Sequence, residues 1–269
     1  MDAIAKTAYY CCGVRAADAA SANPICGDHL AQRFMTPEAR EVFRNFETLS
    51  NPNASNVTRH RIIDDWLRRR LAETPDLRVV ILGAGFDTRA YRLTGGRWLE
   101  LDQPALIATK NAALPASESP NPLVRTGIDF AKQSLSDVLR DWSEDRPAVV
   151  VMEGVSMYLS QDQLLATLAA LRQHFPRHTL MCDLMTAQFV RRYSGAVRQR
   201  ISDLGGQFAA LVDDPASAIV AAGCRQTERV SMIARASELG ALKIPRFLLN
   251  TVLRSLRDGY CAYQFETVG

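Results

Sequence analysis

An apolar run that ends in a glycine turn stands out in the hydrophobic pattern of the chain. Residues 79–82 are four consecutive apolar residues, as expected of a strand that is buried on both faces. The run stops at Gly83-Ala84-Gly85, and Asp87 and Thr88, residue types that favour helix starts, come next. The pattern predicts a strand, a tight turn and a helix, an arrangement typical of sites for nucleotide-type ligands.

After this first strand, strand-like and helix-like segments alternate along the chain. Such alternation predicts right-handed crossovers and a parallel sheet with helices on both faces. We therefore expect an α/β fold with a doubly wound, mostly parallel, seven-stranded Rossmann-like sheet. The six further strands are predicted at residues 98–102, 123–126, 149–152, 179–184, 225–232 and 260–266.

The segment before the first strand has helical periodicity. Residues 1–60 are rich in Ala, Arg and Asp, are interrupted at Asn23-Pro24 and Thr36-Pro37, and contain no convincing strand pattern. They are predicted to form a helical N-terminal cap. A helix over residues 57–71, with apolar positions at helical spacing, then leads into the first strand.

Two later segments, 187–222 and 244–256, are also predicted to be helical. Because no linker or repeat divides the chain, we expect a single domain over residues 1–269. Its predicted parts are the cap (1–60), a cofactor-binding core (61–184), and a lid or substrate region with the last two strands (185–269).

Charge and composition narrow the classes of partner. Lys and Arg (32) exceed Asp and Glu (29) by only three, and 47% of the residues are hydrophobic. The triplets Arg59-His60-Arg61 and Arg68-Arg69-Arg70 fit a solvated helix face. A nucleic-acid-binding surface would need a longer basic stripe with interleaved aromatic residues, so we expect no nucleic acid partner.

The six cysteines show no Cys-x-x-Cys spacing and no paired cysteine and histidine cluster, so we expect no metal and reduced, mostly buried thiols. The N-terminal segment lacks an apolar signal core, and nowhere are there eighteen consecutive apolar residues. A cytoplasmic protein without a membrane partner is the expectation.

Acidic residues recur where the predicted strands end. Asp87 follows the glycine turn, and the later strands end in or near the other four acids. The carboxyl ends of parallel strands meet at one edge of a sheet, where ligands bind. A single acid there fits a helix cap, but the repetition favours a binding site. The other four are Asp102, Asp129, Glu153 and Asp183.

Two classes of ligand compete for the glycine turn. A dinucleotide is typically bound by G-x-G-x-x-G, but Thr88 stands where the third glycine would be. Asp87 would also place a carboxylate against the pyrophosphate. S-adenosylmethionine carries a sulfonium and an ammonium group and no phosphate, so a glycine turn with nearby acids suits it. The alternative is an NAD-binding oxidoreductase or a non-catalytic nucleotide-binding protein.

The acids then take distinct roles toward S-adenosylmethionine. Asp102, at the end of the second strand, can accept hydrogen bonds from both ribose hydroxyls. Asp129 can accept from the adenine amine while Phe130 packs on the ring, although Phe130 fits a core position equally well. Glu153, after the fourth strand, faces the methionine end and can accept from its ammonium group.

The spaced motifs together resemble a known family. LGAGFDTRAYRL, LELDQP, GIDF and MEGVSMYL, in this order, are similar to the signatures of the leucine carboxyl methyltransferase family. The resemblance is to its bacterial branch of S-adenosylmethionine-dependent O-methyltransferases, often linked to polyketide or secondary metabolism. The resemblance extends over almost the whole chain, because two further segments, AADAASANPICGDHLAQRFM and VTRHRIIDDWL, are similar to the same branch. The chain departs from this branch at Cys11-Cys12-Gly13, where relatives tend to have small apolar residues.

The resemblance implies roles for individual residues. Gly83 and Gly85 match glycines that line the methionine part of the cofactor. Asp102 matches the acid that holds the ribose. The pair Asp129 and Phe130 matches the adenine-binding position, and Glu153 matches the residue near the amino-acid end of the cofactor. An arginine before the first strand binds the cofactor carboxylate in the family. Arg59 and Arg61 both fall in that motif, and Arg59 is favoured.

The acceptor is less defined than the cofactor. A carboxylate acceptor needs no base, whereas a phenol does, and the sequence does not choose between them. Tyr158 and Asp183 are the candidates for the acceptor pocket of a small molecule. His174 and His178, before the fifth strand, are interpreted as surface residues. The oligomeric state is left open.

Overall fold

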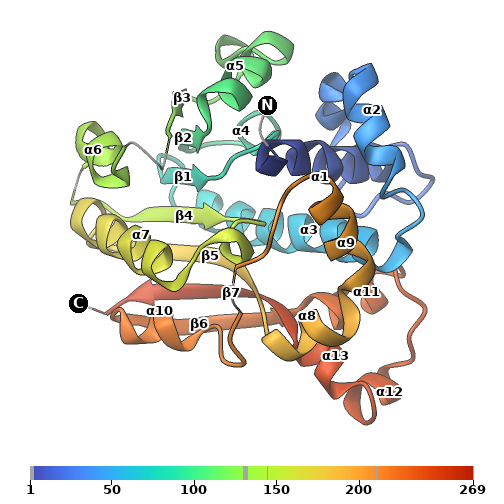
Figure 1. The fold of residues 1–269 in the computed structure, drawn as a ribbon. Coiled ribbons are helices and arrows are strands. Elements are labelled where there is room, and N and C mark those ends of the chain that lie inside the picture. The colour runs from blue at the N-terminus through green and yellow to red at the C-terminus, as the bar shows by residue number, and fades with distance from the viewer. Residues whose placement is uncertain (1–2, 130–132, 144, 210, 269) are drawn as a thin grey trace.

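The computed structural model describes residues 3–129, 133–143, 145–209 and 211–268, which form a seven-stranded sheet with flanking helices (Figure 1). The strand order is β3-β2-β1-β4-β5-β7-β6. Strands β1 to β5 pair in parallel, and β7 is antiparallel to both β5 and β6. The predicted mostly parallel α/β sheet is confirmed. The strands are β1 (Arg78–Leu82), β2 (Arg97–Asp102), β3 (Leu123–Gly127), β4 (Ala148–Met152), β5 (His178–Met185), β6 (Cys224–Ser231) and β7 (Tyr260–Thr267).

Helices cover both faces of this sheet. Figure 1 shows α7 and α10 in front of the strands and α3 behind them. The helices are α1 (Ala3–Ala19), η1 (His29–Phe34), α2 (Pro37–Arg44), α3 (Ser50–Glu73), α4 (Arg89–Arg92), α5 (Pro104–Ala113), η2 (Ala116–Glu118), α6 (Leu135–Leu139), η3 (Arg140–Trp142), η4 (Ser156–Tyr158), α7 (Gln161–His174), α8 (Ala187–Tyr193), α9 (Gly195–Asp203), α10 (Ser217–Ala221), α11 (Met232–Glu238), α12 (Arg246–Asn250) and α13 (Arg254–Asp258).

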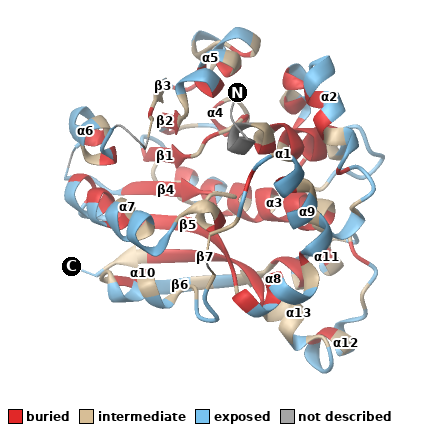
Figure 2. Ribbon diagram, viewed as in Figure 1, coloured by how far each residue is buried: buried red, intermediate tan, exposed pale blue. Residues whose placement is uncertain are grey.

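The core lies in two apolar layers, because the strands are buried on both faces. Every residue of β1 and β4 is buried, and Figure 2 shows the buried positions concentrated along the central strands. Val79 of β1 packs in one cluster with Trp66 of α3. Its neighbour Val80 points the opposite way and packs in a second cluster with Leu171 of α7. Successive residues of β1 therefore pack into opposite apolar layers.

The N-terminal helices form a third apolar cluster that sits on the glycine turn. The ring of Phe86 stacks on Tyr9 of α1 and on Phe34 of η1, with centroid distances of 5.0 and 4.8 Å. The predicted helix over 57–71 is part of the longer α3, so the expected boundary between cap and core at residue 60 falls inside one continuous helix. The cap is therefore joined rigidly to the sheet.

Two predicted helical segments are broken in the structure. Residues 187–222 form α8, α9 and α10, with non-helical chain between α9 and α10. Residues 244–256 hold α12 and the start of α13 in place of one helix. Pro245 precedes the first helical residue, and Thr251 has φ −120° and ψ −97°, outside the helical region. The β-branched pair Thr251 and Val252 disfavours continuation.

The interpretation of His174 and His178 as surface residues is wrong, because both are buried. The His174 ring contacts the hydroxyls of Ser136 and Ser143, and His178 Nδ1 lies 2.7 Å from the Phe175 carbonyl oxygen. Burial lowers the pKa of His178, so its ring stays neutral near neutral pH. The contacts that draw both rings inside arise from tertiary packing, which a sequence pattern does not reveal.

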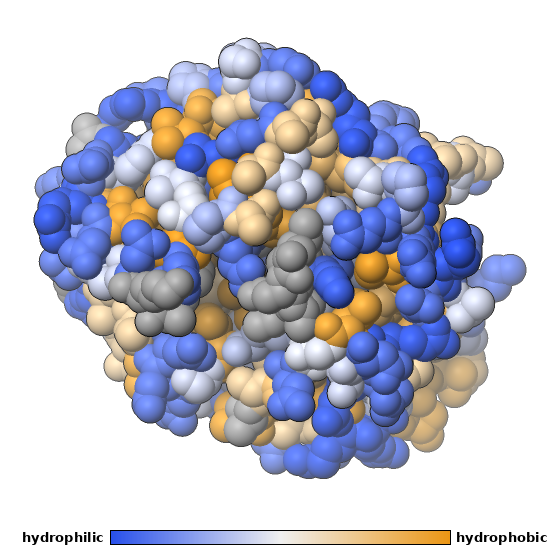
Figure 3. All heavy atoms as spheres, turned by 45° about the horizontal axis from the view of Figure 1, so that its top comes forward, coloured by the Kyte–Doolittle hydropathy of each residue, from blue (hydrophilic) through white to orange (hydrophobic). Residues whose placement is uncertain are grey.

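Hydrophilic residues dominate the surface seen in Figure 3, with hydrophobic residues in smaller patches between them. None of the helices in the described ranges is both long and apolar enough to cross a membrane. All six cysteines are free, and five of them are buried. The expectation of mostly buried thiols is confirmed.

A buried ion pair attaches the cap to the glycine turn. Asp28 accepts hydrogen bonds from Arg15 Nε at 2.9 Å and from the Thr88 hydroxyl at 2.6 Å, and Arg92 Nε lies 3.4 Å away. Arg15 also donates to the Phe86 carbonyl at 2.7 Å. Burial favours the neutral carboxyl, but Arg15 and Arg92 outweigh it and lower the pKa of Asp28 to about 2.

Replacing Asp28 by Asn should destabilise the protein by about 3–5 kcal/mol at pH 7, because a buried guanidinium loses its partner. The folded-state pKa lies below the unfolded value near 3.8, so the stability from ionised Asp28 is present above about pH 4. It is lost as the pH falls toward 2. Denaturant unfolding should therefore show a smaller loss of stability on acidification in D28N than in the wild type, because the contribution of Asp28 is absent while Asp64 and Glu153 still titrate.

The exposed pair of Arg33 and Glu118 offers a matched control for this experiment. Glu118→Gln should change the free energy of unfolding by less than about 1 kcal/mol. Equal effects of D28N and E118Q would show that the buried pair does not attach the cap.

Candidate cofactor and acceptor site

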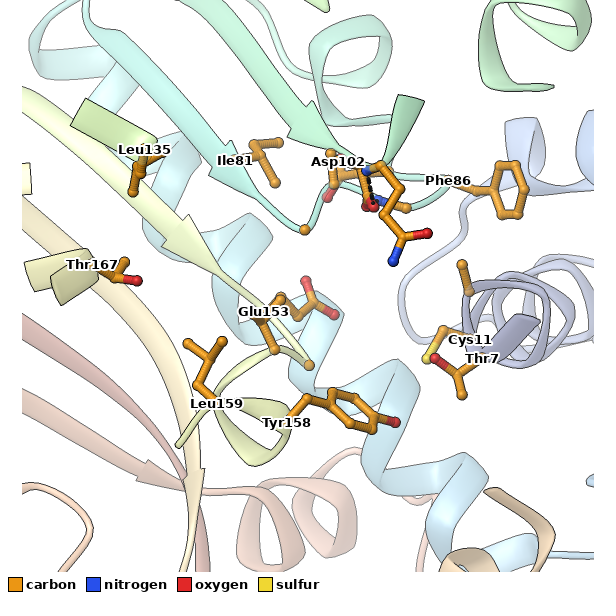
Figure 4. A pocket seen from close by; sticks show the side chains of 18 of the residues that line it. Thr7, Cys11, Ile81, Phe86, Asp102, Leu135, Glu153, Tyr158, Leu159 and Thr167 are labelled. Carbon is orange, nitrogen blue, oxygen red and sulfur yellow. Dashed lines mark hydrogen bonds between the residues drawn. The ribbon is translucent and has the colours of Figure 1, made fainter. Parts of the chain in front are cut away.

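A cavity of about 450 Å³ lies at the carboxyl ends of β1, β2 and β4. In Figure 4, Asp102 and Glu153 face this space from the sheet side. Cys11 of α1 and Tyr158 of η4 lie at one end of the cavity, and Thr167 of α7 lies at the other. The structure thus brings three of the five predicted strand-end acids, Asp87, Asp102 and Glu153, to one elongated site covered by the cap.

The glycine turn is shaped for close backbone approach. Gly83 and Gly85 have φ of +65° and +45°, in the left-handed region that favours glycine. A Cβ on Gly83 would lie 2.4 Å from the Val155 side chain. Asp102 accepts a 2.6 Å hydrogen bond from the Gly85 N–H and a 2.7 Å bond from the Gln103 N–H. These bonds fix the carboxylate at the rim of the cavity.

Glu153 is the centre of a buried ion network. Its carboxylate contacts Arg59 Nε at 3.1 Å, Arg89 Nη2 at 2.7 Å and His60 Nδ1 at 3.3 Å. Burial alone would raise the pKa of Glu153, but Arg89, His60 and Arg59 together hold it well below its usual range. Glu153 is therefore ionised, and much of its hydrogen-bonding capacity is already used by the protein.

Asp87 is neutralised by a neighbour from its own turn. Its carboxylate accepts hydrogen bonds from the Arg89 backbone N–H, at 2.7 Å, and from Arg89 Nη1. The Asp87 carboxylate was predicted to lie against the pyrophosphate of a dinucleotide and so to disfavour it. Because Arg89 compensates that charge, Asp87 alone does not exclude a pyrophosphate.

Three of these side chains, His60, Asp87 and Glu153, have ligand atoms within 4.8 Å of one another, as a metal ion would require. The Arg89 guanidinium occupies that position instead, since it contacts all three. Burial, followed by the charge of Arg89, lowers the pKa of His60. The close approach of His60, Asp87 and Glu153 is therefore explained by their shared contacts with Arg89.

The structure separates the two arginine candidates. Arg59 is buried and lines the cavity, whereas the Arg61 side chain is 40% exposed and binds Asp65 and the Ile25 carbonyl. The triplet Arg59-His60-Arg61 is therefore not a solvated face, because its first two members point inward. Arg68, Arg69 and Arg70 remain partly exposed, as expected.

The two acceptor-pocket candidates have different surroundings. Asp183 is completely buried and accepts bonds from the Gly154 N–H at 2.6 Å, the Tyr260 hydroxyl at 2.9 Å and Arg59 at 3.2 Å. It supports Arg59 and does not line the cavities described here. Tyr158 does line them, and burial raises the pKa of its phenol, so it stays protonated and cannot act as a base.

The structure describes only one of the two residues that were predicted to bind adenine. Asp129 is partly buried, and its backbone N–H donates to the Gln133 side chain at 3.0 Å. Phe130 lies outside the described residues. The cavity residues on this side include Ser134 and Leu135. The role of Asp129 in binding adenine stays a prediction.

Sequence reasoning missed a wall of the cavity on α7. Gln163, Ala166, Thr167 and Ala170 line it at helical spacing. No chemical motif marks these residues, and the same spacing is typical of any packed helix face. Thr7 and Cys11 of α1 were missed for the same reason.

A second cavity, of about 220 Å³, adjoins the first. The two share Thr7, Cys11, Arg59, Gly154 and Tyr158, which lie between them. Its walls are largely apolar and aromatic, and they include three residues of the region expected to form a lid. Those three residues are Phe189, Tyr193 and Phe208.

The seven-stranded sheet with antiparallel β7 and an acid-rimmed glycine turn defines the chain as a Rossmann-like methyltransferase. Residues 8–172, more than half of the chain, match the family model of leucine carboxyl methyltransferase. The chain therefore belongs to the leucine carboxyl methyltransferase family, and the resemblance seen in its motifs is confirmed.

Individual relatives agree with this class. The chain is 28% identical over 193 residues to the tetracenomycin polyketide synthesis O-methyltransferase TcmP of Streptomyces glaucescens, covering 68% of this chain and 67% of that protein. It is 26% identical over 225 residues to the S-adenosyl-L-methionine-dependent methyltransferase dpfgK of Gibberella zeae, covering 75% and 72%. A DUF574 family protein from Streptomyces avermitilis shares the fold, with a TM-score of 0.62, 13% identity and coverage of 89% and 95%.

The chain is an S-adenosylmethionine-dependent methyltransferase. The family match and the named relatives support this cofactor and give no support to an NAD-binding oxidoreductase.

Replacing Asp102 by Ala should weaken binding of S-adenosylhomocysteine by roughly 1–3 kcal/mol, about 5- to 150-fold, because the ribose hydroxyls lose their acceptor. Titration calorimetry measures the change. Asp137→Ala, which alters an exposed acid on α6, is the control and should bind normally. An unchanged affinity of D102A would remove Asp102 from the site.

Arg59 and Arg61 allow a matched test within one helix. Arg59→Lys keeps the charge but loses the planar fork that reaches Glu153 and Asp183. We expect its affinity for S-adenosylhomocysteine to fall roughly 10-fold or more, whereas Arg61→Lys should stay within about twofold of the wild type. The reverse order would assign the cofactor carboxylate to Arg61.

Proposed function

We propose that this protein transfers the methyl group of S-adenosylmethionine to an oxygen atom of a small, largely apolar molecule. The observation that carries the proposal is the pair of adjoining cavities. Both have mainly apolar linings, but the first carries Asp102, Glu153 and the glycine turn, and the second carries aromatic side chains. They share Cys11, Arg59 and Tyr158. A cofactor in the first and an acceptor in the second would meet at this junction.

The charge of the first cavity suits the cofactor. The buried or nearly buried members of the ion network around it are five carboxylates and four guanidinium groups, a surplus of one negative charge with His60 neutral. The half-exposed Arg68 contacts Asp64 from outside this set. A ligand with a sulfonium, an ammonium and one carboxylate has one net positive charge and complements that surplus. The members are Asp28, Asp64, Asp87, Glu153, Asp183, Arg15, Arg59, Arg89 and Arg92.

Hydrogen-bonding groups suit the cofactor as well. Asp102 is held at the rim with a carboxylate that can accept from vicinal hydroxyls. Arg59 Nη2 lies 4.0 Å from the Cys11 sulfur, a weak contact that leaves donor capacity for a carboxylate. The positive φ of Gly83 and Gly85 keeps side chains out of the space between them.

The bound cofactor supplies a methyl group activated by the sulfonium. Displacement at this carbon is in line, so the task of the protein is to hold the acceptor oxygen on the axis of the breaking bond. Arg59 and Glu153 fix the polar end of the path, and the aromatic walls orient the acceptor. Phe189, Tyr193 and Phe208 would thereby place the acceptor.

The named relatives favour a small-molecule acceptor from secondary metabolism, since TcmP acts in polyketide synthesis. The nearly balanced charge gives no reason to invoke a nucleic acid partner. Free, mostly buried thiols fit a reaction in the reducing cytoplasm.

Titration of the protein with S-adenosylhomocysteine, S-adenosylmethionine and NAD(H) tests the cofactor assignment. We expect micromolar binding of the first two and none of NAD(H), because the net negative network disfavours a pyrophosphate. A labelled methyl group offered with a panel of phenols, alcohols, carboxylic acids and peptides with a C-terminal leucine should then appear in a small molecule. NAD binding without S-adenosylhomocysteine binding would overturn the proposal.

A further inference from the structure

Asn56 of α3 is the polar group that the cofactor argument leaves without a role. It lines the second cavity and is only 6% exposed. Its amide nitrogen donates to the Cys11 sulfur at 3.2 Å, and Cys11 lies at the junction of the two cavities. Its Oδ1 atom is buried and has no hydrogen-bond partner among the described residues.

A buried carbonyl oxygen without a partner costs free energy, so it points to a ligand that supplies the missing donor. Asn56 stands one turn before Arg59 on α3, so the two side chains occupy the same helix face. A ligand group that donates a hydrogen bond to Asn56 Oδ1 would therefore lie next to Arg59, the residue expected to hold the methionine end of the cofactor.

Apart from Asn51, which is exposed, the other polar side chains of the cavity are already paired. Four hydroxyl groups donate to acceptors in the protein, and the two remaining phenols are paired with a hydroxyl. The donors are Tyr10 (to Asn53), Ser55 (to the Asn51 carbonyl), Ser194 (to the Val190 carbonyl) and Tyr260 (to Asp183), and the paired phenols are Tyr158 (with Thr7) and Tyr193 (with Ser255).

The one cationic side chain among the residues described around this cavity is Arg59. It already contacts Glu153 and Asp183, and its remaining donor capacity is the part assigned above to the cofactor carboxylate. An acceptor carboxylate accepts hydrogen bonds only, so here it would be desolvated with little compensation. A hydroxyl group brings its own donor. The hydrogen-bond polarity of the cavity therefore selects hydroxyl compounds over carboxylic acids.

We propose that Asn56 Oδ1 binds the reacting hydroxyl of the acceptor, and that the acceptor is a neutral phenol or alcohol of one or two rings. This inference rests on the proposed methyltransferase function. The ring count follows from the cavity of about 220 Å³, below the ~300–1,000 Å³ of sites for drug-sized ligands. The aromatic side chains Phe189, Tyr193 and Phe208 favour a flat molecule.

In the reaction, the acceptor oxygen forms a bond to the methyl carbon while the carbon–sulfur bond breaks and its electron pair goes to sulfur. The hydroxyl becomes more acidic as its oxygen gives up electron density, and its proton passes to water. The hydrogen bond to Asn56 Oδ1 strengthens during this step, because a donor that gains positive charge binds a carbonyl more tightly. Asn56 thus both orients the oxygen and favours the transition state.

Substitutions of Asn56 test this role in the full-length protein. Asn56→Leu removes the acceptor atom and should lower kcat/KM for a phenolic acceptor about 5- to 150-fold, mainly through kcat, with S-adenosylhomocysteine affinity within about twofold. Asn56→Asp keeps an acceptor oxygen but loses the donor to Cys11, so it should stay within about 10-fold of the wild type. If N56D is as impaired as N56L while both still bind S-adenosylhomocysteine, Asn56 acts only by holding Cys11, and the inference is wrong.

Thr58 provides a matched control on the same helix. Its buried hydroxyl also has no partner among the described residues, but it does not line either cavity. Thr58→Val should retain kcat/KM within about twofold. A loss equal to that of N56L would attribute the effect to packing of α3 and not to the acceptor.

Acceptor pairs that differ only in the reacting group complete the test. Phenols or alcohols and the carboxylic acids on the same ring are offered with labelled S-adenosylmethionine, and we expect ethers in clear excess over methyl esters. Esters as the main product would overturn the assignment of the acceptor while leaving the methyltransferase function intact. Binding of no S-adenosylhomocysteine, or transfer to no member of the panel, would count against both.

Discussion

The arrangement of this protein depends on buried arginines that are each paired with carboxylates. Charged groups can leave water only with partners, because an unpaired buried charge costs several kcal/mol. Glu153 satisfies this requirement at the centre, where Arg59, Arg89 and His60 converge on one carboxylate. These partners come from α3, from the start of α4 and from the end of β4, so pairing also sets where these elements meet.

The same network connects the parts of the site. Arg59 contacts Glu153 on the cofactor side and Asp183 and Tyr260 beneath the second cavity. Asp28 and Arg15 extend the pairing into the cap, next to the turn that carries Gly85. Cap and sheet therefore place their side chains relative to one another through buried charges, and Arg59 lines both cavities.

The two cavities differ in what they offer a ligand. The first presents a fixed carboxylate, positive-φ glycines and a net negative network, which suit a cationic cofactor with a ribose. The second presents aromatic walls, hydroxyls that are already paired, and the buried Oδ1 of Asn56, which has no hydrogen-bond partner among the described residues. Membership in a family named for carboxyl methylation does not by itself determine whether the acceptor is a carboxylate or a hydroxyl compound. That choice depends on whether the hydrogen-bonding groups of the second cavity accept or donate.

Local pattern determined the strands, the glycine turn and the acids at the strand ends, because a buried strand needs consecutive apolar residues and its end needs a turn. Tertiary structure decided the partners. Arg59 and Arg61 stand two residues apart and only the fold shows which one turns inward, while Asp183 became a support for Arg59. Arg59 pairs with Glu153, which lies 94 residues further along the chain. Non-local packing also buries the Asn56 Oδ1 atom without a hydrogen-bond partner among the described residues. Periodicity and spacing in the sequence do not encode such contacts.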